Sequence, residues 1–189
     1  DFYSIESLNS LEKFLRCLHL EIDRYASFGR SGIRFDTIYF GGGTPSLLSP
    51  QAIGQILDRL HKNFQFSSNA EVTLETNPGT VDLEKLKGFR DLGVNRLSVG
   101  IQSFHDDELK FLSRIHSAKE AKECIKLAQK AGFENVSLDL IFALPDQSLR
   151  RWKENVSTAV SLSPQHISAY SLIIEHGTPL ARMVEVGKI

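Results

Sequence analysis

The sequence predicts an α/β protein built on a parallel sheet, and three observations lead to this class. Short segments alternate along the chain with longer segments whose apolar residues recur at helical spacing. The short segments are mostly apolar, as in strands that are covered on both faces. Strands that are separated by helices run parallel, because each helix returns the chain to the same end of the sheet. We therefore expect a parallel sheet whose strand order follows the chain.

The composition is that of an ordinary globular domain. Hydrophobic residues make up 41% and charged residues 24% of the 189 residues, which is normal for a folded domain with a sizeable core. The formal net charge of −1 gives no reason to expect a nucleic-acid partner, and no apolar run is long enough to form a transmembrane segment. We expect one domain over residues 1–189. Because the chain lacks an initiator Met and ends abruptly at Ile189, we also expect it to be a fragment.

The first part of the chain contains two predicted helices and two predicted strands. Apolar residues at helical spacing predict a helix over residues 6–27, and a short apolar strand follows at residues 37–40. Ser49 followed by Pro50 indicates the start of the next helix, since serine caps free amide groups and proline suits the first turn. Residues 71–75 are predicted to form the second strand.

The rest of the chain repeats the same alternation. A helix is expected from about Asp82 to Gly93, and the sequence Ser117–Glu120 is a capping box that opens another. A further helix is expected over residues 149–162, and strands are expected over residues 96–102, 136–144 and 167–174. About five strands are too few for a closed eight-stranded barrel. The residues leave open whether the sheet is a partial barrel or an open doubly wound sheet.

Polar residues follow or end several predicted strands, where ligands bind in parallel α/β folds. Gly41–Thr44 follows the first strand, and its glycines permit positive backbone φ angles and close contact with a ligand. A tight turn without a ligand is the alternative, and a P-loop is excluded because no Gly-Lys-Ser/Thr follows. Glu75 ends the second strand and Gln102 ends the third. Taken alone, Glu75 would more often form a salt bridge in a loop.

Asp139 lies inside a predicted strand, where its side chain shares a face with Ser137 and Ile141. A buried carboxylate is costly unless it is paired or hydrogen-bonded, which favours a binding role over a purely structural one. Arg114 follows a helix that begins near His105, and a lone arginine there is usually a solvated surface group.

Together these residues suit a ligand that carries an amine, a carboxylate and hydroxyl groups. The glycine backbone and Glu75 are candidates for the amine, and Arg114 for bidentate binding of a carboxylate. Gln102 and Asp139 are candidates for the hydroxyl groups. The sequence leaves these pairings open.

The cysteines and histidines do not predict a metal site. Cys17 and Cys124 are far apart, and each lies among apolar residues at helical spacing. We expect both to be buried in helices. None of the six histidines forms a pair at metal-ligand spacing.

Four segments resemble, in order and spacing, the landmarks of a known family. They are Phe40–Ser46, Glu75–Pro78, Arg96–Phe104 and Asp139–Gln147. The family is the group of radical S-adenosylmethionine (SAM) proteins that includes oxygen-independent coproporphyrinogen III oxidase and its haem-chaperone relatives. The resemblance implies a parallel-stranded partial (β/α)6 barrel. It also implies SAM contacts at Gly42, Gly43, Thr44, Glu75, Gln102, Arg114 and Asp139.

The resemblance also implies a [4Fe–4S] cluster on three cysteines of a CxxxCxxC loop in the full-length protein. These cysteines are expected just before Asp1, so the chain is expected to lack its first strand, its cluster loop and a C-terminal domain. Asp1-Phe2 at this junction favours the haem-chaperone branch. The oxidase branch, which decarboxylates porphyrinogen propionates, usually has Gly-Cys there and is the alternative. A flavodoxin-like or TIM-barrel phosphate binder would require the four matches to be coincidence.

The implied cofactors are SAM, the [4Fe–4S] cluster and, in the chaperone branch, haem. The implied partners are haem or a porphyrinogen, an electron donor for the cluster and haem-accepting proteins. The expected location is the cytoplasm. Whether the protein is an enzyme depends on the branch, because the oxidase catalyses a reaction whereas the chaperone binds and delivers haem.

Overall fold

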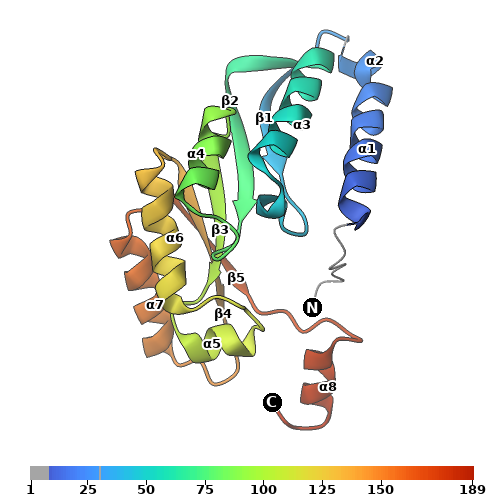
Figure 1. Cartoon of the computed structure of the whole chain (residues 1–189). Helices are drawn as coiled ribbons and strands as arrows, with labels where there is room; N and C mark the ends of the chain where they lie inside the picture. Colours follow the sequence, from blue (N-terminus) through green and yellow to red (C-terminus); the bar gives the residue numbers. More distant parts are fainter. Residues whose placement is uncertain (1–8, 30) are drawn as a thin grey trace.

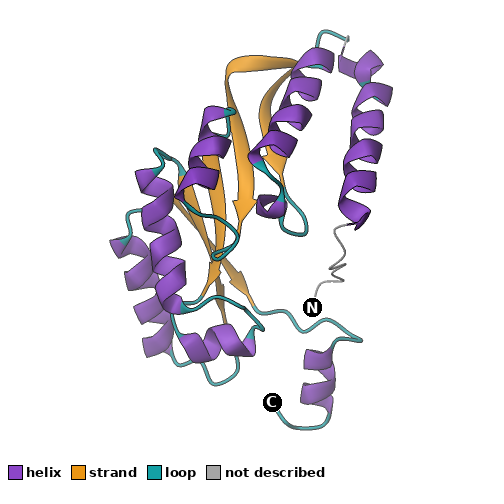
Figure 2. Cartoon of the chain, in the orientation of Figure 1, coloured by secondary structure: helices purple, strands orange, loops and turns teal. Residues whose placement is uncertain are grey.

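The computed structural model describes residues 9–29 and 31–189 and contains one five-stranded parallel sheet. The strands lie side by side in chain order, β1-β2-β3-β4-β5, as predicted (Figure 1). Their bounds are β1 Arg34–Phe40, β2 Gln65–Thr76, β3 Arg96–Gln102, β4 Val136–Phe142 and β5 His166–Ser171. The sheet is twisted and curled like part of a barrel (Figure 2). The fifth strand ends three residues earlier than the sequence predicted.

Helices connect the strands and agree with most of the predicted segments. Their bounds are α1 Asn9–Arg24, α2 Ala26–Gly29, the 3-10 helix η1 Pro45–Leu47, α3 Pro50–Asn63, α4 Leu83–Asp91, α5 Asp106–Phe111, α6 Ala118–Lys130, α7 Leu149–Ser161 and α8 Pro179–Glu185. The helix predicted over residues 6–27 is divided at Tyr25, and its first residues lie outside the described part of the chain. So does the Asp1-Phe2 dipeptide that favours the haem-chaperone branch. Helix α8 was not predicted.

The predicted helix ends are confirmed by their capping contacts. Ser49 Oγ accepts a hydrogen bond from Ala52 N at 3.2 Å. Ser117 and Glu120 form the reciprocal capping box at the start of α6. Gly93 ends α4 with a φ of 103°, a left-handed conformation that favours glycine. These local contacts fix where the chain leaves each helix.

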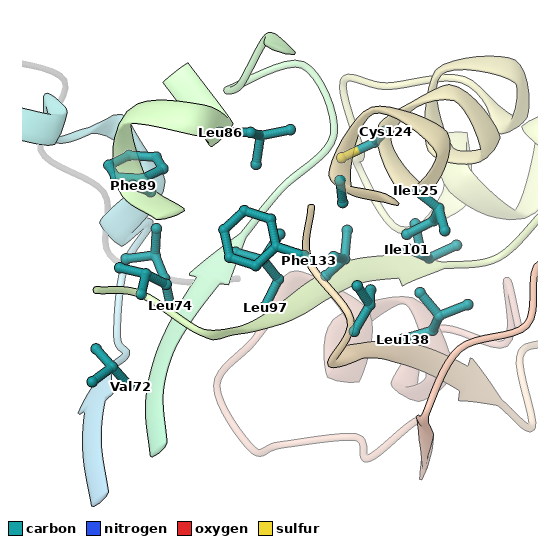
Figure 3. Packing of buried hydrophobic residues seen from close by; sticks show 14 of the residues in the cluster. Val72, Leu74, Leu86, Phe89, Leu97, Ile101, Cys124, Ile125, Phe133 and Leu138 are labelled. Carbon is teal, nitrogen blue, oxygen red and sulfur yellow. The ribbon is translucent and has the colours of Figure 1, made fainter. Parts of the chain in front are cut away.

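The main hydrophobic core lies between the sheet and helices α3, α4 and α6, with Ala159 contributed by α7. Leu97 and Ile101 of β3 and Leu138 of β4 face this core and pack among Phe89, from α4, and Ile125, from α6 (Figure 3). Because side chains alternate along a strand, Ser98 and Gln102 of β3 and Asp139 of β4 point to the other face of the sheet. That face is concave and carries polar side chains.

The cysteine prediction is half right. Cys124 is buried in α6, and burial raises the pKa of its thiol to about 12. Cys17 lies on α1 as predicted but is exposed. The buried side of α1 passes through Leu15, Leu18 and Ile22, and Cys17 falls outside this stripe.

Leu97 provides a test of the core. Its side chain is wholly buried at the centre of the sheet, so Leu97→Ala is expected to lower the free energy of unfolding by about 3–5 kcal/mol through lost burial and a residual cavity. Urea denaturation measures this change. Leu20→Ala is the matched control, because Leu20 is 62% exposed, and it should change stability by about 0.5 kcal/mol or less. Equal losses in the two variants would contradict the described core.

Candidate functional site

A cavity of about 150 Å³ lies at the carboxyl ends of the strands. Five of the seven predicted site residues line it, and each comes from a different segment of the chain: Gly43, Glu75, Gln102, Arg114 and Asp139. The remaining lining residues are Thr76, Asn77, Ser98 and Gly100. The sheet therefore brings together polar groups that are up to 96 positions apart in the sequence.

The other two predicted residues, Gly42 and Thr44, border this cavity but do not line it. Gly42 N donates a hydrogen bond to Glu75 Oε2 at 3.1 Å. Thr44 Oγ1 accepts a hydrogen bond from Asn77 Nδ2 at 3.3 Å. Both residues instead line a separate, mostly apolar cavity of about 430 Å³ beside α1. Their hydrogen bonds with Glu75 and Asn77 connect them to residues that line the polar cavity.

The glycine turn after β1 and the carboxylate of Glu75 form one unit. Gly42 and Gly43 have φ angles of 80° and 58°, which a residue with a side chain adopts only under strain. Besides the bond from Gly42 N, Glu75 accepts a hydrogen bond at Oε1 from Tyr39 Oη at 2.9 Å. The carboxylate is thus held from two sides beside a stretch of exposed backbone.

Gln102 adopts an uncommon backbone conformation at the end of β3. Its φ is 69°, in the left-handed region, and the register between β3 and β4 shifts between Gly100 and Gln102. At Gly100 an added Cβ would lie 2.6 Å from Asn77 Oδ1 and 3.0 Å from Gln102 Nε2, so a larger residue would displace these two side-chain ends, which line the cavity. Strained residues of this kind persist only where the surrounding structure holds them, and they gather at functional sites.

Asp139 is half-buried on the concave face and contacts its strand neighbour. Ser98 Oγ donates to the carboxylate at 3.1 Å from Oδ2 and 3.3 Å from Oδ1. Burial nevertheless raises the pKa of Asp139 above its ordinary value, and the nearby charge of Glu75 acts in the same direction. The hydrogen bonds that Asp139 receives from the protein therefore offset only part of the free-energy cost of burying its charge.

Arg114 supplies a positive charge on the other side of the cavity. Its Nε atom is buried, and within the described residues it has no hydrogen-bond partner. Burial lowers the pKa of the guanidinium below its ordinary value. A buried nitrogen of a guanidinium without a hydrogen-bond partner is costly, so the arrangement favours an anionic ligand group at this position. The alternative of a fully solvated surface arginine does not describe this partly buried side chain.

The combined chemistry of the cavity selects for a particular kind of ligand. Two carboxylates and one guanidinium leave an excess of one negative charge, and two side-chain amides and two hydroxyl groups surround them. Such a set fits a ligand with a carboxylate, hydroxyl groups and an excess of positive charge. The cavity volume of about 150 Å³ is smaller than the roughly 300–1,000 Å³ of a pocket that encloses a whole cofactor. It therefore accommodates part of such a ligand.

Four lining residues and one supporting residue were missed by reasoning from the sequence. Ser98 and Gly100 share a strand face with Gln102, so the alternation of side chains provides a signal for them. Thr76 and Asn77 directly follow Glu75 at the strand end, which is a weaker signal. Tyr39 had no such signal, because its contact with Glu75 crosses 36 positions.

The described part of the chain contains neither a cluster of metal ligands nor a membrane-spanning helix. No group of three or more His, Cys, Asp or Glu side chains there is arranged to hold a metal ion. No helix in residues 9–29 and 31–189 is both long and apolar enough to cross a membrane.

Fold and site together define an α/β half-barrel protein with a polar ligand cavity at the carboxyl ends of its parallel strands. Residues 20–159 match the radical SAM superfamily. This match covers most of the chain, and the chain belongs to that superfamily.

Individual relatives agree with this assignment. The chain is 46% identical over 148 residues to the haem chaperone HemW of Haemophilus influenzae, covering 78% of this chain and 39% of that protein. It is 38% identical over 189 residues to HemW of Bacillus subtilis, covering 99% of this chain and 49% of that protein. The chain thus spans two fifths to half of the length of these relatives.

A solved structure confirms the fold. Coproporphyrinogen III oxidase (HemN) from Escherichia coli, a radical SAM enzyme, superimposes with a TM-score of 0.81 at 27% identity, covering 89% of this chain and 39% of that one. The expectation of a partial barrel is confirmed, with five parallel strands in the described residues.

The raised pKa of Asp139 predicts how the stability of the protein depends on pH. In the folded state this pKa lies above its ordinary value of 3.8, chiefly through burial. The contribution of Asp139 to stability is therefore fully present below the ordinary pKa, and it is lost as pH rises through the raised pKa. We expect Asp139→Asn to be at least as stable as the original chain at pH 7, and relatively less stable in acid.

Urea denaturation of both proteins over a series of pH values measures this difference. Asp36→Asn is a matched control, because Asp36 also accepts a hydrogen bond from a serine, Ser67, at the opposite end of the sheet, and it should not show the same trend. If Asp139→Asn were less stable by a constant amount at every pH, Asp139 would be an ordinary structural residue.

Proposed function

We propose that the cavity at the carboxyl ends of the strands binds SAM. The observation that carries the proposal is the convergence of the Arg114 guanidinium, with its buried, unpartnered Nε, and the carboxylates of Glu75 and Asp139 in one cavity. SAM carries a carboxylate, an ammonium, a sulfonium and two ribose hydroxyls. Its net positive charge complements the excess negative charge of the cavity.

The contacts that we propose follow from the chemistry of each side chain. Arg114 binds the SAM carboxylate, since a guanidinium matches a carboxylate in a bidentate fashion. Glu75 binds the ammonium together with the backbone of the glycine turn at Gly42, Gly43 and Thr44. Gln102 and Asp139 bind the ribose hydroxyls. Tyr39 keeps the Glu75 carboxylate in place through its hydrogen bond.

SAM bound beside a reduced [4Fe–4S] cluster supplies radical chemistry in this superfamily, and we include such a cluster in the proposal. The cysteines of this chain do not fit the role of cluster ligands. Three thiolates are expected, whereas the chain has two cysteines. Burial raises the pKa of the Cys124 thiol to about 12, which keeps it protonated, and Cys17 lies on a different helix. The cluster ligands of the proposal are therefore residues outside this sequence.

We further propose that the protein handles haem as a chaperone. Two relatives named as haem chaperones are 46% and 38% identical to the chain, whereas the solved coproporphyrinogen III oxidase is 27% identical. The difference favours haem binding and delivery over decarboxylation of a porphyrinogen, which remains the second candidate. We also propose that the protein passes haem to haem-accepting proteins and receives electrons for its cluster from a donor protein. Its proposed location is the cytoplasm.

Isothermal titration with SAM tests the cavity. Asp139→Asn keeps the shape of the side chain but removes its charge, so it replaces a charge-assisted hydrogen bond worth about 1.5–3 kcal/mol with a weaker one. The expected loss of SAM affinity is about 10- to 100-fold. Asp36→Asn is again the control and should bind SAM as the original chain does. Unchanged affinity in Asp139→Asn would remove this residue from the SAM site.

Haem handling is tested on the complete gene product after anaerobic cluster reconstitution. A chaperone is expected to bind haem in an absorbance titration and to leave coproporphyrinogen III unchanged when SAM and a reductant are added. Release of carbon dioxide from coproporphyrinogen III would instead establish the second candidate. Absence of haem binding would overturn the chaperone proposal without affecting the SAM site.

A further inference from the structure

The backbone turn that presents Gln102 to the cavity depends on a buried histidine outside the cavity. We propose that His116 is a positioning residue, which holds the carbonyl group of Ile101 and thereby fixes Gln102 in its ligand-binding conformation. The inference rests on the proposed SAM site and names a residue that controls its affinity without touching the ligand.

The turn at Gln102 is closed by a single short hydrogen bond. Ser103 N donates to Ile101 O at 2.9 Å, which joins residues on either side of Gln102. With a φ of 69° at Gln102, this is the positive-φ form of the γ-turn, which is rare and strained. Left to itself, a glutamine would relax to a negative φ, and its amide would leave the cavity. Other contacts must therefore stabilise the turn.

His116 makes a contact that stabilises this turn. Its side chain is buried, and its Nε2 lies 3.2 Å from Ile101 O, the same oxygen that closes the turn. Because a carbonyl oxygen only accepts hydrogen bonds, Nε2 carries the proton. Burial lowers the pKa of His116, and the charge of Arg114 adds to this effect, so the imidazole is neutral at pH 7. The two donors use both lone pairs of the Ile101 carbonyl.

The residues after the turn are already held by other groups. Phe104 N donates to Asn155 Oδ1 at 2.6 Å, and Asn155 Nδ2 donates to Glu108 Oε2 at 2.9 Å. Ser103 Oγ donates to the same Glu108 oxygen at 2.5 Å. Helices α5 and α7 thus fix the chain after Gln102. Before Gln102 in the sequence, the Ile101 carbonyl accepts its side-chain hydrogen bond from His116.

The position of His116 in the sequence links two parts of the site. It lies two residues after Arg114, on the loop between α5 and α6. Arg114 lines the cavity, whereas His116 does not and instead lies against the strand end. One loop therefore places the guanidinium and supports the turn of the glutamine. Loss of the His116 contact is expected to weaken ligand binding through Gln102, and not by removing a ligand contact of its own.

The first measurement is independent of any ligand. His116→Leu fills the same buried position with an apolar side chain of similar size but removes the donor to Ile101 O. We expect amide hydrogen exchange of Ser103, followed by NMR, to accelerate about tenfold or more, because the turn opens more often. His116→Gln, which retains an N–H donor, is expected to restore at least part of the protection. Unchanged Ser103 exchange in His116→Leu would overturn the proposal.

The second measurement is SAM affinity by isothermal titration. His116→Leu is expected to weaken binding about 5- to 10-fold, the effect of one neutral hydrogen bond, with partial recovery in His116→Gln. His61→Leu is the matched control. His61 also contacts a backbone carbonyl, with Nδ1 2.8 Å from Leu57 O, but it lies on α3 away from the cavity and should leave SAM affinity unchanged.

A double-mutant cycle separates positioning from a general loss of stability. Gln102→Gly removes the amide and tolerates the positive φ. In this background, His116→Leu is expected to change SAM affinity by less than about twofold, because nothing remains to be positioned. The same 5- to 10-fold loss with and without Gln102 would overturn the inference. Failure of the original chain to bind SAM would instead overturn the proposed function, and Ser103 exchange would still decide the role of His116.

Discussion

The alternation of side chains along β3 is the constraint on which the rest of the structure depends. Leu97, Val99 and Ile101 are buried in the core against the helices, so Ser98, Gly100 and Gln102 must face the other way. The three apolar residues hold the sheet to its helical layer, and the polar face that results becomes the floor of the cavity. A shift of one residue in register would reverse both faces at once. Stability and binding therefore rest on the same strand.

The cavity concentrates features that cost free energy in the folded chain. The pKa of Asp139 is raised by burial, Arg114 has a buried nitrogen without a partner among the described residues, and Gln102 has a positive φ. The costs at Asp139 and Arg114 fall when a ligand supplies the missing charge or hydrogen bond. The surrounding core contains many wholly buried apolar side chains, and their burial stabilises the fold enough to offset the free-energy cost of these local features. Such a site is prepared for its ligand before the ligand arrives.

Membership of the radical SAM superfamily and the proposed haem function rest on different evidence. The family match and the fold cover most of this chain, and the proposal of SAM binding rests on the charged and polar residues that line the cavity. The proposed haem function rests on relatives that are named as haem chaperones. The chain spans two fifths to half of the length of these relatives. The proposal of SAM binding therefore rests on residues of this chain, while the choice between chaperone and oxidase depends on the whole protein.

The sequence by itself determined the class of fold, the five strands, their order and most helix ends. These features depend on apolar periodicity and capping groups within a few residues, as at Ser49 and Ser117. The resemblance singled out the site residues, five of which the fold gathers around one cavity. Only the tertiary structure decided that Cys17 is exposed, that Tyr39 holds Glu75, and that His116 supports the turn at Gln102. Such contacts join segments that are distant in sequence, and no local pattern encodes which side chains meet once the helices have packed on the sheet.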